Sequence, residues 1–221
     1  MLWKKRDQKA SNTTHQLDTP FAYHELNTAI KQSKRGSTPG ADHITYEMLQ
    51  HLPRKCISMI LLLYNELWKQ GKLIQDWKHS VIIPIKKPGA SAHNYESYRP
   101  IALTASLCKI MERIIMNRLW WYLEKNHLLN DVQAGFRTNR STVDQLLRLH
   151  TDAYNGIKAK KVTIAILYDF SKAFDLMWHG GLLKKLRKLG ITGNTYNWIT
   201  DFLTGRTRQT RVGSSLSEKS K

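Results

Sequence analysis

Apolar residues recur every three or four positions along most of this chain and form short continuous runs in two places. The strongest helical pattern begins at Ser106, and its apolar positions share one helix face: Leu107, Ile110, Met111, Ile114, Ile115 and Leu119. The same spacing predicts further helices over residues 20–34, 44–51, 54–70, 142–154, 182–189 and 196–203. Helices therefore account for most of the predicted structure.

Several predicted helix ends carry local signals. Thr19 and Pro20 suit the N-cap and the first helical position of the first helix. Gly71 follows the helix over 54–70, and glycine commonly ends a helix in the left-handed conformation. Ser141 and Asp144 resemble a capping box, in which two side chains bind backbone N–H groups at a helix start.

Two apolar runs have strand character instead. Val81–Ile85 is predicted as a strand, and Pro84 within it indicates an edge or a bulge because proline has no N–H to donate. Val162–Tyr168 is β-branched and aliphatic with almost no polar interruption, which predicts a buried strand. A basic extended run is predicted over Arg206–Val212. Helices that outnumber separated strands indicate an α/β or α+β architecture of two subdomains, the first mainly helical with a β-hairpin.

Asp169 directly follows the predicted strand Val162–Tyr168 and is the first candidate for chemistry. An unpaired charge at the mouth of a core strand is unfavourable. A divalent cation offsets that cost, because Mg²⁺ is held in proteins by one or two carboxylates together with substrate phosphates. The alternative is a helix cap or turn residue, which is the more common role of an isolated aspartate after a strand.

The charge of the chain points to a polyanionic partner. Its 35 lysines and arginines outnumber its 17 aspartates and glutamates, which gives a net charge of +18. Nucleic acid fits such a balance through phosphate contacts. A membrane partner is disfavoured because no long uncharged apolar segment occurs. Cys56 and Cys108 lack the spacing of a zinc site or a disulfide framework. The start has no apolar segment of a secretory signal, so we expect an intracellular protein, in the cytoplasm or the nucleus.

Several segments taken together resemble one family, the reverse transcriptases of non-LTR (LINE-type) retrotransposons, which are related to group II intron polymerases. Each segment alone is weak, but they occur in the family's order and spacing over roughly residues 36–212. The segments are Gly36–Asp42, Trp77–Gly89, Tyr98–Leu103, Lys109–Glu112, Gln133–Arg137, Arg140–Thr142 and Tyr168–Asp175, with Trp178 and His179 after the last.

The resemblance implies a right-hand polymerase. Residues 1–18 would be a flexible lead-in, 19–160 the fingers, and 161–221 the first part of the palm. The implied activity is RNA-directed DNA synthesis by two-metal nucleotidyl transfer, with Mg²⁺ or Mn²⁺ as cofactor. The implied partners are an RNA template, a DNA primer and deoxynucleoside triphosphates.

The resemblance also assigns roles around Asp169. Asp169 matches the first metal-binding aspartate of the palm, and the backbone carbonyl of Phe170 would be a second ligand of the same ion. Phe174 matches the bulky residue that lies under the deoxyribose and rejects a 2′-hydroxyl. Asp175 ranks second, because it is better suited to ordering the turn into the following helix.

Three basic residues match the part of the fingers that reaches the triphosphate, namely Lys86, Lys87 and Arg99. Arg99 precedes Pro100, and its guanidinium suits a bidentate phosphate contact that a lysine does not reproduce. Without the family, Lys86 and Lys87 fit a solvated hairpin tip better than a binding site.

A second group matches a loop that grips the template: Gln133, Gly135, Phe136 and Arg137. Glycine would let the backbone approach nucleic acid closely, and Phe136 would stack on a base. By itself Phe136 is more typical of a core anchor.

Two family elements do not occur in these 221 residues. No Asp-Asp dipeptide is present, so the family's Tyr-x-Asp-Asp hairpin is missing, and so is its Pro-Gln-Gly-Ser loop. We therefore expect a palm that stops before that hairpin and no polymerase turnover from this chain alone, since two-metal transfer needs converging carboxylates. The alternative is a non-catalytic nucleic-acid-binding remnant of such an element.

Overall fold

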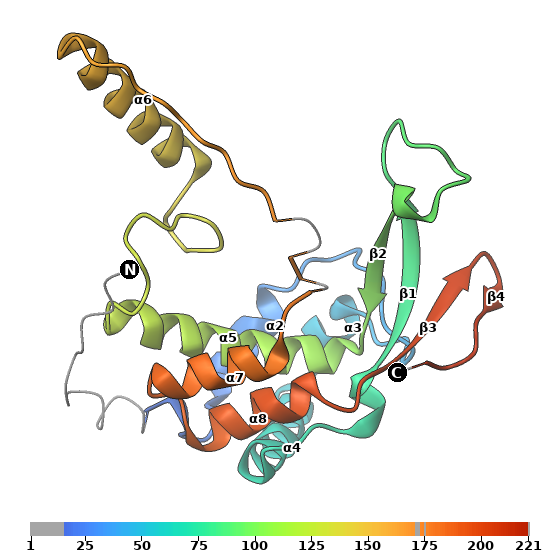
Figure 1. Ribbon diagram of the computed structural model, residues 1–221. Coiled ribbons are helices and arrows are strands. Elements are labelled where there is room, and N and C mark those ends of the chain that lie inside the picture. The colour runs from blue at the N-terminus through green and yellow to red at the C-terminus, as the bar shows by residue number, and fades with distance from the viewer. Residues whose placement is uncertain (1–15, 171–172, 175, 221) are drawn as a thin grey trace. The chain divides into compact units, whose positions relative to one another are not determined.

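The computed structural model describes residues 16–170, 173–174 and 176–220 (Figure 1). The chain forms two compact units. The first unit comprises the described residues up to Tyr122 together with those from His179 onward. The second unit is Leu123–Trp178.

Helices make up most of the first unit. They are α2 (Tyr23–Lys31), α3 (Tyr46–Gln50), α4 (Arg54–Gln70), α5 (Ser106–Lys125, whose last turn belongs to the second unit), α7 (His179–Lys188) and α8 (Gly193–Leu203). The predicted apolar face of α5 is confirmed, because Ile110, Met111 and Ile114 are almost completely buried. They pack in one core with Tyr64 of α4 and Trp198 of α8. This core carries the sheet described next.

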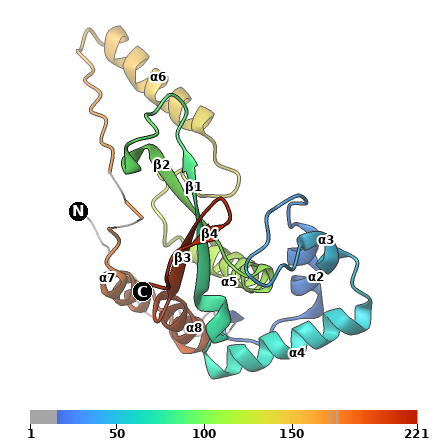
Figure 2. The same cartoon turned by 90° about the vertical axis from the view of Figure 1, so that its right-hand side faces the viewer.

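The sheet has four strands in the order β2-β1-β3-β4. They are β1 (His79–Lys86), β2 (Tyr98–Leu103), β3 (Thr207–Val212) and β4 (Ser215–Leu216). β1 pairs with β2 in antiparallel and with β3 in parallel orientation, and β3 pairs with β4 in antiparallel orientation. The β1–β2 hairpin projects away from the helices, with the connection over 87–97 at its tip (Figures 1 and 2). A mixed α/β fold is thus confirmed, and the division into fingers and palm stays a prediction.

Pro84 lies in β1, an interior strand of the sheet. Its backbone nevertheless has no strand partner on one side, as in an edge strand. β3 pairs only with residues 79–82 of β1, so it does not extend to Pro84. On the other side Pro84 faces Pro100 of β2, and neither residue has an N–H to donate. The strand therefore accommodates a proline that a fully paired position would exclude.

Two of the local helix signals are confirmed and one prediction is wrong. Gly71 ends α4 in the left-handed conformation (φ 62°), and the Ser141–Asp144 capping box forms. The helix predicted from Pro20 onward, α2, begins at Tyr23 instead. The reason is that the Glu25 carboxylate accepts the Ala22 N–H at 2.8 Å and so places the helix start there.

The second unit contains α6 (Thr142–Lys158) and two irregular segments. The prediction of a buried strand over Val162–Tyr168 is wrong for this structure. The segment is irregular, and its side chains are exposed, as Leu167 (90%) illustrates. A strand needs a neighbour for its backbone N–H and C=O groups, and within the described part of the chain none pairs with this segment.

α6 is amphipathic, but its apolar side is not covered. The polar positions gather on the opposite side of the helix, and no residue of α6 is buried. Its exposed apolar side chains are Val143, Leu146, Leu147, Leu149, Tyr154 and Ile157.

In the described residues no helix is long and apolar enough to cross a membrane.

Candidate nucleic-acid interface

The β1–β2 hairpin separates two of the predicted phosphate-binding residues. Arg99 pairs with Ile85 across the hairpin, whereas Lys86 pairs with Tyr98. Residues directly opposite each other share a face, and successive residues alternate, so Arg99 and Lys86 lie on opposite faces. Lys87 begins the tip, where its Nζ donates to the Glu96 carbonyl at 2.8 Å. The three cations therefore do not form one cluster.

The face that carries Arg99 also carries an apolar hollow of about 270 Å³. Its floor comes from the hairpin, including Ile83 and Ile101, and its rim includes Arg211 of β3 and Thr38. Arg211 reaches this face because β3 continues the sheet beside β1. Sequence reasoning marked Arg206–Val212 only as a basic extended run. Arg208 and Arg211 are three positions apart in this run, so in a strand they lie on opposite faces, and this spacing was the signal that one of them would share a face with Arg99.

The loop that contributes Thr38 is held against the end of β2. A Cβ atom on Gly40 would lie 2.6 Å from the Thr104 carbonyl carbon and oxygen, so only glycine fits there. At the other end of the loop, the Gly36 N–H donates to the Glu47 carboxylate. These contacts fix the loop beside the hollow.

Gly40→Ala is expected to lower the free energy of unfolding by about 3 kcal/mol, the upper end of overpacking effects, because backbone atoms must move. Gly36→Ala is the matched control: nothing lies within 4 Å of its Cβ position, but its φ is 72°. That substitution is expected to cost about 1 kcal/mol through backbone strain alone. Urea unfolding of both variants measures the difference. Equal losses would contradict the close approach to Thr104.

In the second unit, all three nitrogens of the Arg137 guanidinium donate hydrogen bonds to nearby groups. Its Nε and Nη2 donate to the two Glu124 carboxylate oxygens at 2.8 and 2.6 Å. Its Nη1 donates to the carbonyls of Asn130 and Gln133 at 2.8 and 3.2 Å. The hydrogen bonds from Arg137 hold the pKa of Glu124 below its usual value. Arg137 therefore organises the loop between α5 and α6, with only 5% of its side chain exposed.

The other predicted template residues lie on the surface of this loop. Gln133 and Gly135 are exposed, and Phe136 is 82% exposed in a left-handed backbone conformation (φ 61°). Phe174 lies against Phe136, with ring centroids 6.3 Å apart and the rings nearly perpendicular. The structure thus brings together two aromatic residues to which the sequence assigned separate roles.

Asp169 and Phe170 lie at the end of the exposed irregular segment, also in the second unit. The Phe170 side chain is 82% exposed. Asp175, the second-rank candidate, lies outside the described residues. The hairpin cations belong to the first unit, so the predicted site residues are distributed over both units.

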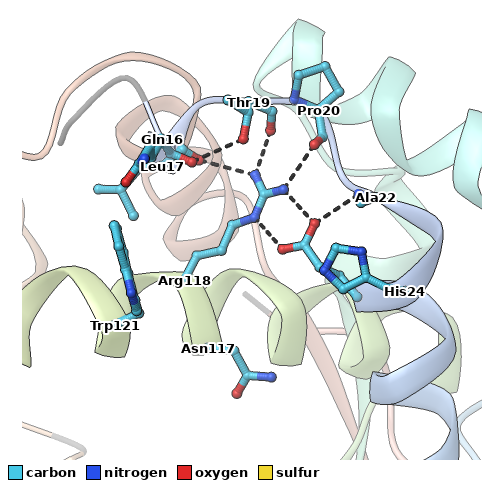
Figure 3. A pocket seen from close by; sticks show the side chains of 10 residues that line it. Gln16, Leu17, Thr19, Pro20, Ala22, His24, Asn117, Arg118 and Trp121 are labelled. Atoms are coloured by element: carbon cyan, nitrogen blue, oxygen red, sulfur yellow. Dashed lines mark hydrogen bonds and ion pairs between the residues drawn. The ribbon is translucent and has the colours of Figure 1, made fainter. Parts of the chain in front are cut away.

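A hollow of about 600 Å³ lies beside α5, and several polar groups that line it are already bonded to one another (Figure 3). Arg118 points from α5 toward the chain before α2, where Nη2 donates to the Pro20 carbonyl at 2.9 Å and Nη1 to that of Thr19 (Figure 3). Its guanidinium also forms a bidentate ion pair with Glu25, in which Nε and Nη2 each donate to a carboxylate oxygen at 2.6 Å. These groups join α5 to the N-terminal segment, which is a structural role.

Comparison with known proteins identifies the family. The family described as reverse transcriptase (RNA-dependent DNA polymerase) matches residues 85–220, more than half of the chain. Over 198 residues the chain is 35% identical to the probable RNA-directed DNA polymerase from transposon BS of Drosophila melanogaster. The chain belongs to the reverse transcriptases of non-LTR retrotransposons.

Two further relatives of the chain come from other elements. It is 32% identical over 200 residues to the RNA-directed DNA polymerase from mobile element jockey of Drosophila melanogaster. It is 30% identical over 196 residues to the Pol polyprotein from type-1 retrotransposable element R2 of Popillia japonica. The three matches cover 90%, 86% and 88% of this chain but only 22%, 22% and 26% of the relatives. The chain thus spans about a quarter or less of their length.

The oxygen donors near Asp169 fit a hard metal ion in kind but not in number. Asp169 and the Phe170 carbonyl offer oxygen ligands, the type that Mg²⁺ prefers. Among the residues that the structure describes, no three or more His, Cys, Asp or Glu side chains form a metal-binding group.

Proposed function

We propose that these 221 residues form part of an RNA-directed DNA polymerase, to which they contribute the fingers and the first part of the palm. The family match over residues 85–220 carries the proposal, because it includes the hairpin cations and the segment Tyr168–Asp175. The substrates would be an RNA template, a DNA primer and deoxynucleoside triphosphates.

Asp169 and the Phe170 carbonyl would hold Mg²⁺ together with the nucleotide phosphates. When bound, the metal stabilises negative charge on the transferred phosphoryl group and lowers the pKa of the attacking hydroxyl. Phe174 would exclude ribonucleotides, because a rigid ring under the sugar leaves no space for a 2′-hydroxyl. Phe136 is a neighbour of this ring, at a centroid distance of 6.3 Å.

The hairpin geometry favours Arg99 among the candidate phosphate contacts. Its guanidinium is exposed on the face that bears the apolar hollow, and a guanidinium can bind two phosphate oxygens at once. Lys86 faces the other side of the hairpin, and Lys87 donates to the Glu96 carbonyl within the tip. We therefore place Arg99 and Arg211 on the nucleic-acid side.

Binding of an RNA–DNA duplex tests the proposal with the 221-residue chain itself. The affinity is expected to fall steeply between about 50 and 200 mM salt, because bound cations release counterions from the phosphates. Arg99→Ala is expected to reduce the slope of log affinity against log salt by about 1. Fluorescence anisotropy with a labelled duplex measures both. Lys55→Ala, an exposed cation on α4, is the control and should leave the slope unchanged.

If the chain binds no nucleic acid, that result contradicts the proposed function. An unchanged salt slope in Arg99→Ala would instead remove only the hairpin from the interface. A second candidate function, nucleic-acid binding without catalysis, is favoured by the lack of a multi-carboxylate group among the described side chains. Both candidates require binding, and they differ in the polymerase assay discussed below.

A further inference from the structure

The end of α7 carries a group of neighbouring cations, all with exposed side chains: Lys184, Lys185, Arg187 and Lys188. We call this surface the α7 basic face. Lys184, Arg187 and Lys188 lie on the side of the helix opposite Leu186, whose side chain is buried, and Lys185 flanks them. The solvent-facing side of α7 is therefore strongly positive.

The acidic groups near α7 are already bound by internal donors. From the start of α7 to the end of α8 the sequence contains one acidic residue, Asp201. Its carboxylate accepts Lys78 Nζ and the Leu73 N–H, both at 2.7 Å. Asp18 reaches α8, where it accepts the N–H and the hydroxyl of Thr195 at 2.9 and 3.0 Å. Among the described residues, no cation of the α7 basic face takes part in an ion pair.

Helix electrostatics explains only part of this arrangement. Cations in the last turn of a helix interact favourably with the partial negative charge at its C-terminal end. Lys184 precedes that turn, and it lies three and four positions before Arg187 and Lys188, where like charges repel each other. A polyanion bound to the α7 basic face would relieve this repulsion.

Arg187 has an aromatic neighbour on α8. Its guanidinium carbon lies 4.4 Å from the centroid of the Tyr196 ring. A guanidinium over a ring keeps its positive charge, and its planar group loses little freedom when it binds a phosphate. Arg187 is therefore the preorganised cation of the α7 basic face, with lysines on either side.

The α7 basic face is distinct from the hairpin surface. α7 packs against α8 among the helices of the first unit, whereas the β1–β2 hairpin projects away from those helices (Figures 1 and 2). The family segments recognised in the sequence end at His179, before the first of the four cations. Neither the hairpin nor a motif therefore accounts for this cluster.

We propose that the α7 basic face binds the phosphate backbone of a nucleic acid, independently of base sequence, as a second contact surface besides the hairpin. The four cations lie within about 6 Å along the helix axis. A duplex presents about one negative charge per 1.7 Å of its axis, so several phosphates come within reach. The inference rests on the proposed function and adds a second surface to it.

The test combines Lys184→Ala, Lys185→Ala and Lys188→Ala in one α7 variant. Arg187 is retained because of its contact with Tyr196. Alanine favours helix, so α7 should still form. The variant is expected to reduce the slope of log affinity against log salt by about 3, roughly one for each lost phosphate contact. Fluorescence anisotropy with a labelled RNA–DNA duplex measures the slope. Arginine at the same three positions should retain it, because the charges remain.

The matched control replaces three other exposed lysines by alanine, Lys55 and Lys69 of α4 and Lys72 directly after it. Both triple variants lose the same charge, so only its position differs. The control should leave the slope unchanged. An equal reduction in the two variants would overturn the inference, because net charge alone would then explain it. So would an unchanged slope in the α7 variant.

Polyglutamate distinguishes an acidic protein from a nucleic acid as the partner. If the α7 variant loses binding to polyglutamate but binds the duplex like the wild type, the inference is overturned. Failure of the wild-type chain to bind the duplex would overturn the proposed function instead.

Discussion

Arg118→Ala is expected to lower the free energy of unfolding by about 3–5 kcal/mol, which is the effect of breaking a buried ion pair from one side. Only 12% of the Arg118 side chain and 21% of the Glu25 side chain are exposed. The substitution leaves the Glu25 charge with fewer partners and removes the donors to the Leu17, Thr19 and Pro20 carbonyls. Domains are commonly stable by only about 5–15 kcal/mol. Urea unfolding therefore measures a large fraction of the total.

The same ion pair predicts how stability depends on pH. Burial raises the pKa of Glu25, but the Arg118 and Ala22 hydrogen bonds and the Arg118 charge together hold it below its ordinary value of 4.5. A carboxyl with a lowered pKa stabilises the folded state fully above its unfolded pKa. This stabilisation is lost as the pH falls through the lower, folded pKa. Arg118→Ala should remove the lowering and flatten the acid limb of the pH profile.

Two controls separate the geometry of Arg118 from its charge. Arg118→Lys retains the charge but not the two-pronged contact, so we expect an intermediate loss of stability. A double-mutant cycle with Glu25→Ala should give a coupling energy of about 0.5–3 kcal/mol. A coupling energy of zero would contradict a direct interaction between Arg118 and Glu25. Nucleic-acid binding by folded Arg118→Ala is expected to persist.

Features encoded by neighbouring residues could be predicted from the sequence. The end of α4 depends on Gly71 alone, and the start of α6 depends on Ser141 and Asp144, three positions apart. The start of α2 was misplaced although its determinant, Glu25, is also local. Thr19 and Pro20 gave the stronger helix signal, but Arg118 binds both of their carbonyls from about a hundred positions away.

The strand predicted over Val162–Tyr168 failed for a different physical reason. An apolar, β-branched segment shows that burial would be favourable, but it does not supply the neighbouring strand. The apolar side of α6 is a second apolar surface that the described structure leaves open. Both surfaces belong to the second unit.

The sequence proposed the residue types of the candidate site but did not indicate the partners that these residues have in the structure. The motif around Gln133–Arg137 indicated a binding loop, and the loop is exposed. It did not reveal that Glu124, thirteen positions earlier, engages Arg137. Conversely, Arg211 belonged to no motif, and Arg140 was marked only as part of the family segment Arg140–Thr142. The importance of Arg211 follows from the hollow that it lines.

Asp169→Asn is expected to lower primer extension by about a thousandfold in a polymerase of the relatives' length that contains this chain. A neutral amide is a poor ligand for Mg²⁺, and loss of the metal removes several kcal/mol of transition-state stabilisation. Binding of primer–template should not change, because phosphate contacts by cations dominate that affinity. Single-nucleotide incorporation on an RNA template measures the rate. Asp152→Asn, an exposed position on α6, is the matched control.

The 221-residue chain alone is expected to give no extension under the same conditions, because it has no Asp-Asp dipeptide to complete a two-metal site. Extension by this chain would contradict the need for carboxylates beyond Asp169. A longer polymerase that retains its full rate with Asp169→Asn would instead show that Asp169 has only a turn-forming role. If the longer wild-type protein binds primer–template but never extends it, the chain functions in nucleic-acid binding without catalysis.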